Sequence, residues 1–259
     1  MAVLSGTMAQ PSSLGVLWSV LRVLTTTKRP SPQGSGPVDH GPLASVLEAL
    51  AEGGLEGVAG HVAALDGYIQ GAQGIDPDQL SAPESLAYWL NLYNAGAIRL
   101  AVTAAQLEHS SVLRVPGAFG KAFVAVTGEN LSLDAIEHGK IRRFGDPRIH
   151  GALVCGSVSC PTVRFEPYSG AHLSHQLDDQ MRGFLGGGGA AGDGDAILLS
   201  RVFLWFGADL VRPGRMPTFI PAKSRSVLRA LQPWMPEDLK GDRKVRFQSY
   251  DWGLRCAVS

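Results

Sequence analysis

The sequence predicts an α+β fold: a single globular domain in which a mixed or antiparallel sheet packs against helices. The chain has 259 residues, 45% of them hydrophobic and 18% charged, which suffices for a substantial buried core. Patterns typical of helices and patterns typical of strands both occur. They do not alternate in the regular order of a doubly wound parallel sheet, and no internal repeat is visible. These observations favour α+β over α/β.

The N-terminal stretch differs in composition from the rest of the chain. Residues 1–38 contain no Asp or Glu, and Ser and Thr are frequent among them. This composition predicts a disordered, flexible tail or a targeting segment of the transit-peptide kind. Within it, residues 31–37 are rich in Ser, Pro and Gly, which is typical of a linker. We therefore expect the α+β domain to span residues 39–259 of a cytoplasmic protein, or of an organellar one if the segment is a transit peptide.

Helices are expected first in the folded part. Apolar residues at helical spacing over 43–68, interrupted by Gly53 and Gly54, predict two packed helices. Ser81-Ala-Pro-Glu84 is a capping box with proline in the first turn, and it predicts a helix that continues to Leu100. The same patterns predict a strand over 122–126, a helix over 131–144, a buried strand over 149–155, a helix over 169–185, a flexible glycine-rich loop over 186–195, a strand over 196–203, helices over 204–211 and 224–231, and a strand over 244–250.

Composition argues against several classes of protein. The 23 Lys and Arg balance the 23 Asp and Glu, whereas a general nucleic-acid binder needs a basic excess. No uninterrupted apolar stretch reaches about 18 residues, so we expect no transmembrane helix. Three cysteines are too few for a disulfide scaffold. The glycine run at 186–192 lacks the Lys and Ser or Thr that end a phosphate-binding loop, and we expect no cofactor.

Potential chemistry concentrates between residues 146 and 161. His150, Cys155 and Cys160 lie there with two serines, and an imidazole can take the proton of a thiol to give a nucleophilic thiolate. On a regular strand His150 and Cys155 would face opposite sides, so their pairing requires a bulge or a turn at Gly151 or Gly156. Cysteines buried as small apolar residues and a Cys155–Cys160 disulfide remain alternatives. Zinc ligation fits poorly, because a fourth ligand is missing, and we predict no metal site.

Two further groups of residues complete the candidate site. Asn91 and Asn94 lie on one face of an otherwise apolar helix, where each carboxamide needs a partner. They are expected either to order the turn between residues 150 and 160 or to cap the backbone of a neighbouring element. Asp251 lies between Tyr250 and Trp252 after the last strand. It can orient an imidazole, as the third member of a nucleophile–base–acid set, or serve as a turn residue.

Four sequence blocks together resemble the family called domain of unknown function 547. They are Tyr88-Trp-Leu-Asn-Leu-Tyr-Asn-Ala95, Asp146-Pro-Arg-Ile-His-Gly-Ala-Leu-Val-Cys-Gly-Ser-Val-Ser-Cys-Pro161, Leu199-Ser-Arg-Val-Phe-Leu-Trp205 and Tyr250-Asp-Trp-Gly-Leu254, and they fall within residues 80–254. The resemblance implies that the family's signature positions here are Asn91, Asn94, His150, Cys155, Cys160, Pro161, Tyr250, Asp251 and Trp252. Gly151 stands where the family usually has a large aromatic residue. The resemblance implies no particular reaction.

The leading functional hypothesis is a thiol-dependent hydrolase, or an acyl or amide transferase, acting on a small-molecule or peptide substrate. Cys155 or Cys160 would be the nucleophile, with His150 as base and Asp251 as the residue that orients it. Asn91 or Asn94 would stabilise a developing oxyanion, and Tyr250 and Trp252 would help to bind or orient. Two alternatives stay open: a non-catalytic interaction module, and a redox protein that cycles Cys155 and Cys160 through a disulfide. The sequence does not predict an oligomeric state.

Overall fold

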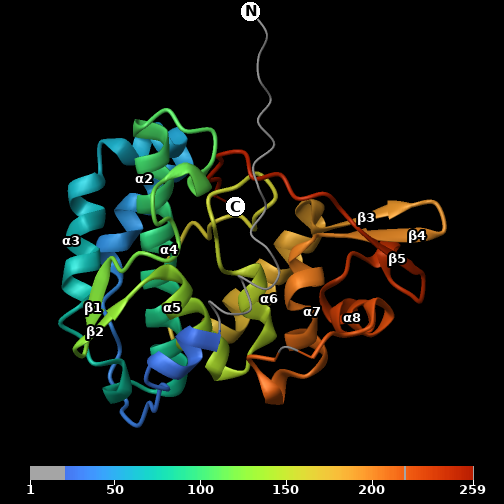
Figure 1. Ribbon diagram of the computed structural model, residues 1–259, viewed down its shortest axis with the longest axis horizontal. Helices are drawn as coiled ribbons and strands as arrows, with labels where there is room; N and C mark the ends of the chain where they lie inside the picture. The colour runs from blue at the N-terminus through green and yellow to red at the C-terminus, as the bar shows by residue number, and fades with distance from the viewer. Residues whose placement is uncertain (1–20, 219, 259) are drawn as a thin grey trace, which may run out of the picture.

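The helices of the N-terminal half pack around one long central helix. The computed structural model describes residues 21–218 and 220–258. Helices α2 (Gly41–Ala59) and α3 (Val62–Ala72) pack on α4 (Ala82–Gln106), as Figure 1 shows. The two-helix prediction over 43–68 is confirmed: Gly54, with φ 58° and ψ −147°, is non-helical and kinks α2 where the sequence predicted the interruption, and a second break follows Ala59.

The predicted start of α4 at Ser81 is confirmed, although the carboxylate of Glu84 binds the N–H groups of Val38 and Gly170 instead of closing the capping box. The hydroxyl of Ser81 accepts a hydrogen bond from the N–H of Glu84 at 3.4 Å, and Pro83 lies in the first turn. Because almost every side chain of the first four turns is buried, α4 acts as the axis of this half of the molecule. A short 3₁₀ turn, η1 (Pro77–Gln79), precedes it, and η2 (Val112–Arg114) follows.

A small hairpin and a short helix come next. Strands β1 (Val124–Val126) and β2 (Glu129–Leu131) pair antiparallel, which confirms the strand expected over 122–126. Helix α5 (Leu133–Gly139) begins where the Ser132 hydroxyl accepts from the N–H of Ala135 at 3.1 Å. It continues as the 3₁₀ turn η3 (Ile141–Phe144), so the predicted helix over 131–144 is present in two parts.

The buried strand predicted over 149–155 is wrong. Residues Pro147–Gly151 form a 3₁₀ turn, η4, followed by an irregular segment. The carboxylate of Asp146 caps this turn by accepting from the N–H of Arg148 at 3.0 Å, and Pro147 takes its first position. The apolar run after His150 is buried because it passes between helices, not because it joins a sheet. A Cβ at Gly151 would lie 3.0 Å from the Cα of Met181, so this turn touches the next helix closely.

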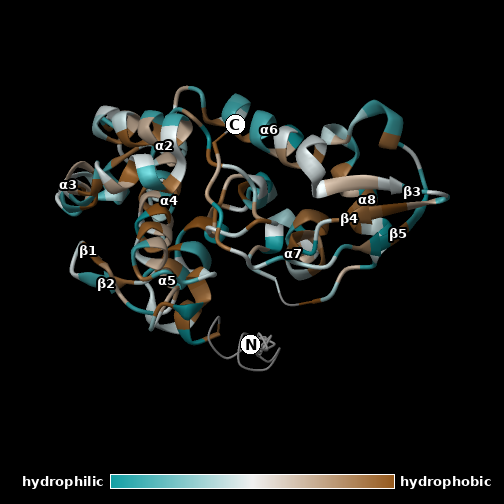
Figure 2. Ribbon diagram, turned by 90° about the horizontal axis from the view of Figure 1, so that it is seen from above, coloured by the Kyte–Doolittle hydropathy of each residue, from teal (hydrophilic) through white to brown (hydrophobic). Residues whose placement is uncertain are grey.

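The C-terminal half carries a mixed three-stranded sheet, which fits the predicted α+β class. Helix α6 (Leu173–Phe184) leads through a π turn, η5 (Leu185–Gly189), into β3 (Ala190–Asp193). Strand β4 (Ala196–Leu199) pairs antiparallel with β3 and parallel with β5 (Lys244–Phe247). Figure 2 shows hydrophobic β4 in brown between its two neighbours. The flexible loop expected over 186–195 is therefore wrong in part, because main-chain pairing with β4 orders residues 190–193 in spite of their glycine.

Two helices complete this half. They are α7 (Val202–Val211) and α8 (Ser224–Leu231), and they pack on each other. The remaining 3₁₀ turns are η6 (Pro213–Arg215), η7 (Gln232–Trp234) and η8 (Glu237–Leu239).

Helix α6 joins the two larger hydrophobic cores of the described residues. Its Leu173 and Leu177 belong to the core around α4, and its Met181 and Phe184 belong to the core under the sheet. In Figure 1 the α2–α5 group lies on one side and α7, α8 and the sheet on the other, with α6 between them. Full burial of each such side chain contributes about 1.5–3 kcal/mol, so α6 couples the two halves strongly.

The stretch expected to be a linker is held against the domain. The carboxylate of Asp78 accepts from the N–H of Ser31 at 2.7 Å, and Gly34 donates to the carbonyl of Leu80 at 3.0 Å. Pairing with the η1 region, more than forty residues further along the chain, thus corrects the linker prediction for residues 31–37. Residues 1–20, with the apolar part of the possible targeting segment, lie outside the described residues. Within the described part of the chain, no helix has the length and hydrophobicity needed to cross a membrane.

Candidate functional site

A tight turn brings the two predicted cysteines together. Gly156 has a φ of 74°, a left-handed conformation that favours glycine, and the N–H of Cys160 donates to the carbonyl of Ser157 at 3.1 Å. The main-chain N–H of Cys155 in turn donates to the sulfur of Cys160 at 2.7 Å. Both cysteines are free thiols and both are partly exposed. A turn at Gly156, one of the two positions at which the sequence allowed one, therefore places Cys160 beside Cys155.

The C-terminal segment runs alongside this turn. The N–H of Val158 donates to the carbonyl of Gly253 at 2.9 Å, and the N–H of Ser159 donates to that of Asp251 at 3.3 Å. Ser157 and Leu254 form an antiparallel bridge in the same register. This pairing carries Tyr250 to the sulfur of Cys155 from the far end of the sequence.

Two hydroxyl groups surround the sulfur of Cys155. The Oγ of Ser157 lies 3.0 Å from the sulfur, and the hydroxyl of Tyr250 lies 3.1 Å from it. The two hydroxyl oxygens are 2.9 Å apart. A thiolate at this position can accept a hydrogen bond from each of them, whereas a neutral thiol can donate to one. The arrangement therefore favours the ionised sulfur.

The three cysteines differ in the pKa of their thiols. Contact with the Cys160 thiol lowers the pKa of the Cys155 thiol to about 7, although burial opposes the shift, and the hydrogen bonds of Ser157 and Tyr250 add to it. Burial raises the pKa of Cys160 well above its ordinary value and that of Cys256 to about 12. Burial also raises the pKa of the Tyr250 phenol, which therefore remains a hydrogen-bond donor at neutral pH. Cys155 is the thiol suited to nucleophilic attack.

His150 has a different partner from the one predicted. Its Nε2 lies 3.0 Å from the carboxylate of Asp209, and its ring stacks on Phe206 at 4.4 Å between centroids. The guanidinium of Arg142 binds the same carboxylate through two hydrogen bonds, at 2.8 and 3.1 Å. The expected pairing of His150 with a cysteine is thus corrected: the 3₁₀ turn directs the ring towards α7, and burial lowers the pKa of the imidazole.

Asp251 lies in an exposed turn and does not contact the imidazole. Its carboxylate accepts from the N–H of Gly253 at 2.8 Å, and its own N–H donates to the Ser159 hydroxyl at 2.9 Å. The structure places it as a turn residue that helps to hold the C-terminal segment on the cysteine turn. Asp209 on α7 is the carboxylate that orients His150. A lone Asp inside an otherwise apolar helix is the sequence signal that could have identified it.

The two asparagines of α4 each bind a backbone N–H and a backbone C=O. Asn94 donates to the carbonyl of Ala152 at 3.0 Å and accepts from the N–H of Val154 at 3.2 Å. Asn91 makes the same pair of bonds with Tyr168, at 2.8 and 2.9 Å. Asn94 therefore fixes the segment that leads to Cys155, which is the ordering role that the sequence left open. Asn91 fixes a neighbouring loop.

A buried acid near the cysteines had no signal in the sequence. Glu137 on α5 accepts a hydrogen bond from the hydroxyl of Tyr93 at 3.2 Å. Burial raises the pKa of its carboxyl to about 7, although Arg142 opposes the shift. Burial, Glu137 and the two cysteines together raise the pKa of Tyr93 well above its ordinary value. Tyr93 thus lies between an acid that titrates near neutral pH and the pair of thiols.

Three aromatic rings lie together beside the thiol site. The ring of Tyr250 is 4.8 Å from that of Trp205 and 4.5 Å from that of Trp252, between centroids. Trp205 comes from α7, so the cluster joins this helix to the C-terminal segment. Of the two predicted binding residues, Tyr250 contacts the sulfur and Trp252 packs behind it.

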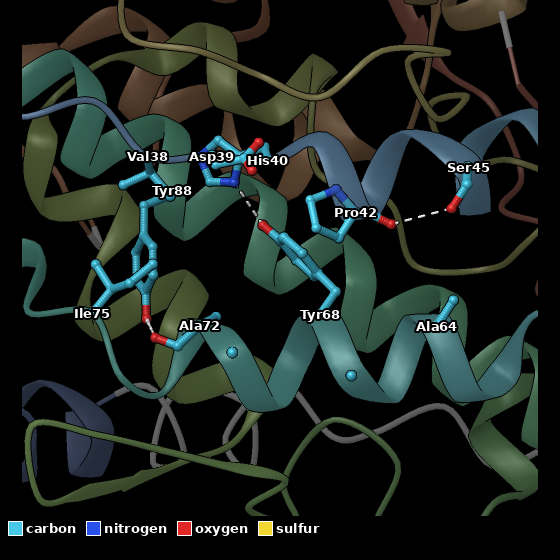
Figure 3. Close-up of a pocket in the computed structure, with 12 residues that line it drawn as sticks. Val38, Asp39, His40, Pro42, Ser45, Ala64, Tyr68, Ala72, Ile75 and Tyr88 are labelled. Atoms are coloured by element: carbon cyan, nitrogen blue, oxygen red, sulfur yellow. Dashed lines mark hydrogen bonds between the residues drawn. The ribbon is translucent and has the colours of Figure 1, made fainter.

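Elsewhere a cavity of about 460 Å³ lies between the start of α2, α3 and Tyr88 (Figure 3). In it the Nδ1 of His40 lies 2.9 Å from the hydroxyl of Tyr68. None of its lining residues belongs to the cysteine site. Among the residues that the structure describes, no group of three His, Cys, Asp or Glu side chains is arranged to hold a metal ion.

Comparison with known proteins identifies one family. Residues 77–185 match the model of the family described as a protein of unknown function, DUF547, which confirms the resemblance seen in the motifs. The match includes α4 and the cysteine turn; Asp209 and Tyr250 lie beyond it. Neither the curated proteins nor the solved structures contain a significant match to the chain.

Proposed function

We propose that this chain, whose residues 77–185 form a DUF547 family domain, is a thiol-dependent hydrolase or an acyl or amide transferase with Cys155 as nucleophile. The observation that supports it is the environment of the Cys155 sulfur, with the hydroxyls of Ser157 and Tyr250 at 3.0 and 3.1 Å. Charge-assisted hydrogen bonds of this kind stabilise a thiolate, which is the nucleophilic form of cysteine.

The proposed reaction has two steps. The thiolate of Cys155 attacks the carbonyl carbon of an ester, thioester or amide; a C–S bond forms and the bond to the leaving group breaks. The leaving group takes up one proton, which balances the proton that the Cys155 thiol released when it ionised. Water or an amine or alcohol then attacks the acyl-enzyme, loses a proton, and restores the thiolate.

The contacts suggest a positioning role for His150. Its ring is bound to Asp209 and stacked on Phe206, and both belong to the helix that carries Trp205. The residue therefore links the chain that precedes Cys155 to α7. In this proposal the sulfur is activated by hydroxyl groups and by the second thiol rather than by an imidazole.

A dithiol redox function is the second candidate, favoured by the contact between Cys155 and Cys160. The thiolate of Cys155 would attack a disulfide substrate, forming a mixed disulfide and releasing one thiolate. Cys160 would lose its proton and attack the sulfur of Cys155, releasing the second thiolate. The substrate disulfide would gain two electrons, and the enzyme would hold a Cys155–Cys160 disulfide.

Alkylation by iodoacetamide as a function of pH tests the nucleophile. We expect Cys155 to react with an apparent pKa near 7, and Cys160 and Cys256 to remain unreactive at that pH. Cys155→Ser should remove the fast reaction, and Cys256→Ser, the matched control, should leave it intact. A Cys155 that titrates near 8.5, as an ordinary thiol does, would contradict the proposal.

The mass of the intact protein separates the two reactions. An activated ester such as p-nitrophenyl acetate should add one acetyl group to Cys155 of the hydrolase or transferase, and the adduct should turn over. A dithiol redox protein should instead lose about 2 Da under mild oxidation, and Cys160→Ser should prevent this loss. Acylation that stops at a stable adduct, with reversible disulfide formation, would favour the redox alternative.

A further inference from the structure

An exposed apolar surface adjoins the nucleophile. We name it the aromatic platform; it consists of Trp205, Tyr250 and Trp252. Trp205 is 41% exposed, whereas Tyr250 and Trp252 are half-buried. Leu204, which precedes Trp205 in α7, is 47% exposed, and Val158 of the cysteine turn is 40% exposed. Large side chains of this kind rarely gather on a surface without a binding role. Since the hydroxyl of Tyr250 touches the sulfur of Cys155, the platform begins at the site of reaction.

The two parts of the platform come from distant elements that other contacts hold in place. The C-terminal segment is paired with the cysteine turn through Val158 and Ser159. The backbone at Gly253 approaches Val158 closely, since a Cβ there would lie 3.4 Å from the Cγ2 of Val158. Helix α7 is fixed by the buried Asp209. The platform is thus a preformed surface, so a ligand would bind without first ordering it.

The spacing of the rings indicates which chemical groups fit. The centroids of Trp205 and Trp252 are 5.9 Å apart with an angle of 27° between the planes, and Tyr250 lies against both. Rings in direct contact leave no space for an ion between them, so this is not a cage for a quaternary ammonium group. The Tyr250 ring is tilted by 50° and 54° to the two tryptophan rings, so the cluster is not one flat surface. The exposed ring of Trp205 instead suits stacking by a flat aromatic group.

We propose that the substrate of the Cys155 site carries an aromatic group close to its electrophilic carbon, and that this group stacks on the aromatic platform during attack. The inference rests on the proposed function, since it assigns a substrate class to the same nucleophile. It distinguishes compounds such as aryl esters, aryl amides and peptides with an aromatic residue at the reacting bond from small aliphatic substrates.

The test compares two alkylating reagents with the same reacting carbon. Iodoacetamide is small, whereas iodoacetanilide carries a phenyl ring on the amide nitrogen; in both reactions a C–S bond forms and iodide leaves. We expect iodoacetanilide to react with Cys155 at least tenfold faster, relative to iodoacetamide, than it does with free N-acetylcysteine. Trp205→Ala should reduce this preference to that of the free thiol. Because the preference is a ratio of two labelling rates measured on the same variant, a change in the rate with iodoacetamide does not alter it.

Two controls keep the result interpretable. Phe165→Ala removes an aromatic ring that is 57% exposed outside the platform, and it should leave the preference intact. Should Trp205→Ala fail to fold, the wild-type protein still decides: unreactive acetanilide should slow labelling by iodoacetanilide. Labelling by iodoacetanilide that acetanilide does not slow would overturn the inference.

The outcomes separate this inference from the proposed function. Fast labelling of Cys155 by both reagents with no aromatic preference would leave the nucleophile standing and overturn the platform as a substrate site; a platform that serves a protein partner would give this result. Slow labelling of Cys155 by iodoacetamide itself would overturn the proposed function and the inference with it.

Discussion

The hydroxyl oxygen of Tyr250 lies 3.1 Å from the sulfur of Cys155, although 95 residues separate the two along the chain. The same hydroxyl lies 2.9 Å from that of Ser157, which follows Cys155 by two residues. Besides its contact with Cys160, the acidity of the Cys155 thiol therefore depends on one hydroxyl from the same turn and on one that only the complete fold brings there.

Removing the Tyr250 hydroxyl should raise the pKa of Cys155. A hydrogen bond to a charged group contributes about 1.5–3 kcal/mol, so Tyr250→Phe should raise the pKa by roughly one unit or more. The rate of iodoacetamide labelling against pH measures the shift. Tyr168→Phe is the matched control: its hydroxyl is buried without a partner, and its loss should leave the Cys155 pKa unchanged.

Substitution of His150 should affect stability more than thiol acidity. His150→Gln removes the ring that stacks on Phe206 and weakens a buried ion cluster, while the groups around the sulfur stay in place. We expect urea unfolding to show a loss of roughly 2–4 kcal/mol, and the Cys155 pKa to change by less than half a unit. A change of a full unit or more would show that the imidazole acts on the Cys155 thiol after all.

Asp209→Asn should be among the most destabilising single changes in the C-terminal half. The neutral side chain would leave the buried guanidinium of Arg142 without its counter-ion, which typically costs 3–5 kcal/mol. Urea unfolding measures the loss. Combining Asp209→Asn with Arg142→Met should recover part of it, because the unpaired charge is removed too. Equal losses in the single and double variants would contradict this account.

The carboxyl of Glu137 should make stability depend on pH. Its folded pKa of about 7 exceeds the ordinary value of 4.5, so its contribution is fully present below pH 4.5 and is lost as the pH rises through 7. Glu137→Gln does not titrate. Relative to wild type, the variant should therefore gain on the order of 3 kcal/mol between pH 4.5 and pH 8, as measured by urea unfolding. A stability difference that is the same at both pH values would show that the carboxyl titrates normally.

The two asparagines of α4 should differ in their effect on the thiol. Asn94→Ala and Asn91→Ala each leave a buried N–H and C=O without partners, and each should destabilise the fold by roughly 2–4 kcal/mol. Asn94→Ala alone should also change the labelling rate of Cys155, since it frees Ala152 and Val154 just before this residue. Identical labelling in both variants would indicate that the cysteine turn is held without Asn94.

Sequence patterns predicted those parts of the fold in which local chemistry decides the structure. The capping box at Ser81 gave the start of α4, and Gly156 gave the turn that joins the cysteines. The run from Ile149 was predicted as a strand because apolar residues follow one another there. A segment buried between α4 and α6 also needs apolar residues, so the pattern does not distinguish the two structures. The 3₁₀ turn begins at the cap that Asp146 forms, with Pro147 in the first position.

The site itself was predictable only in part. Cys155, Cys160 and Tyr250 were among the expected residues, and they meet in the structure. The partner of His150 was not, because a carboxylate on α7 reaches it only through the packing of α7 on η4. Glutamate is common in helices, so the sequence does not single out Glu137. Its raised pKa arises from burial that only the tertiary structure creates.

The C-terminal segment is paired with the cysteine turn by a few main-chain hydrogen bonds, and its side chains Tyr250, Leu254 and Cys256 pack only at the edges of the hydrophobic cores. Opening such a short ladder costs far less than melting α4 or the sheet. Gentle warming or dilute urea should accordingly detach the C-terminal segment first. The reactivity of the Cys155 thiol at neutral pH should then fall while the helices remain intact. Thiol reactivity then measures the local opening of the C-terminal segment rather than the global folding equilibrium.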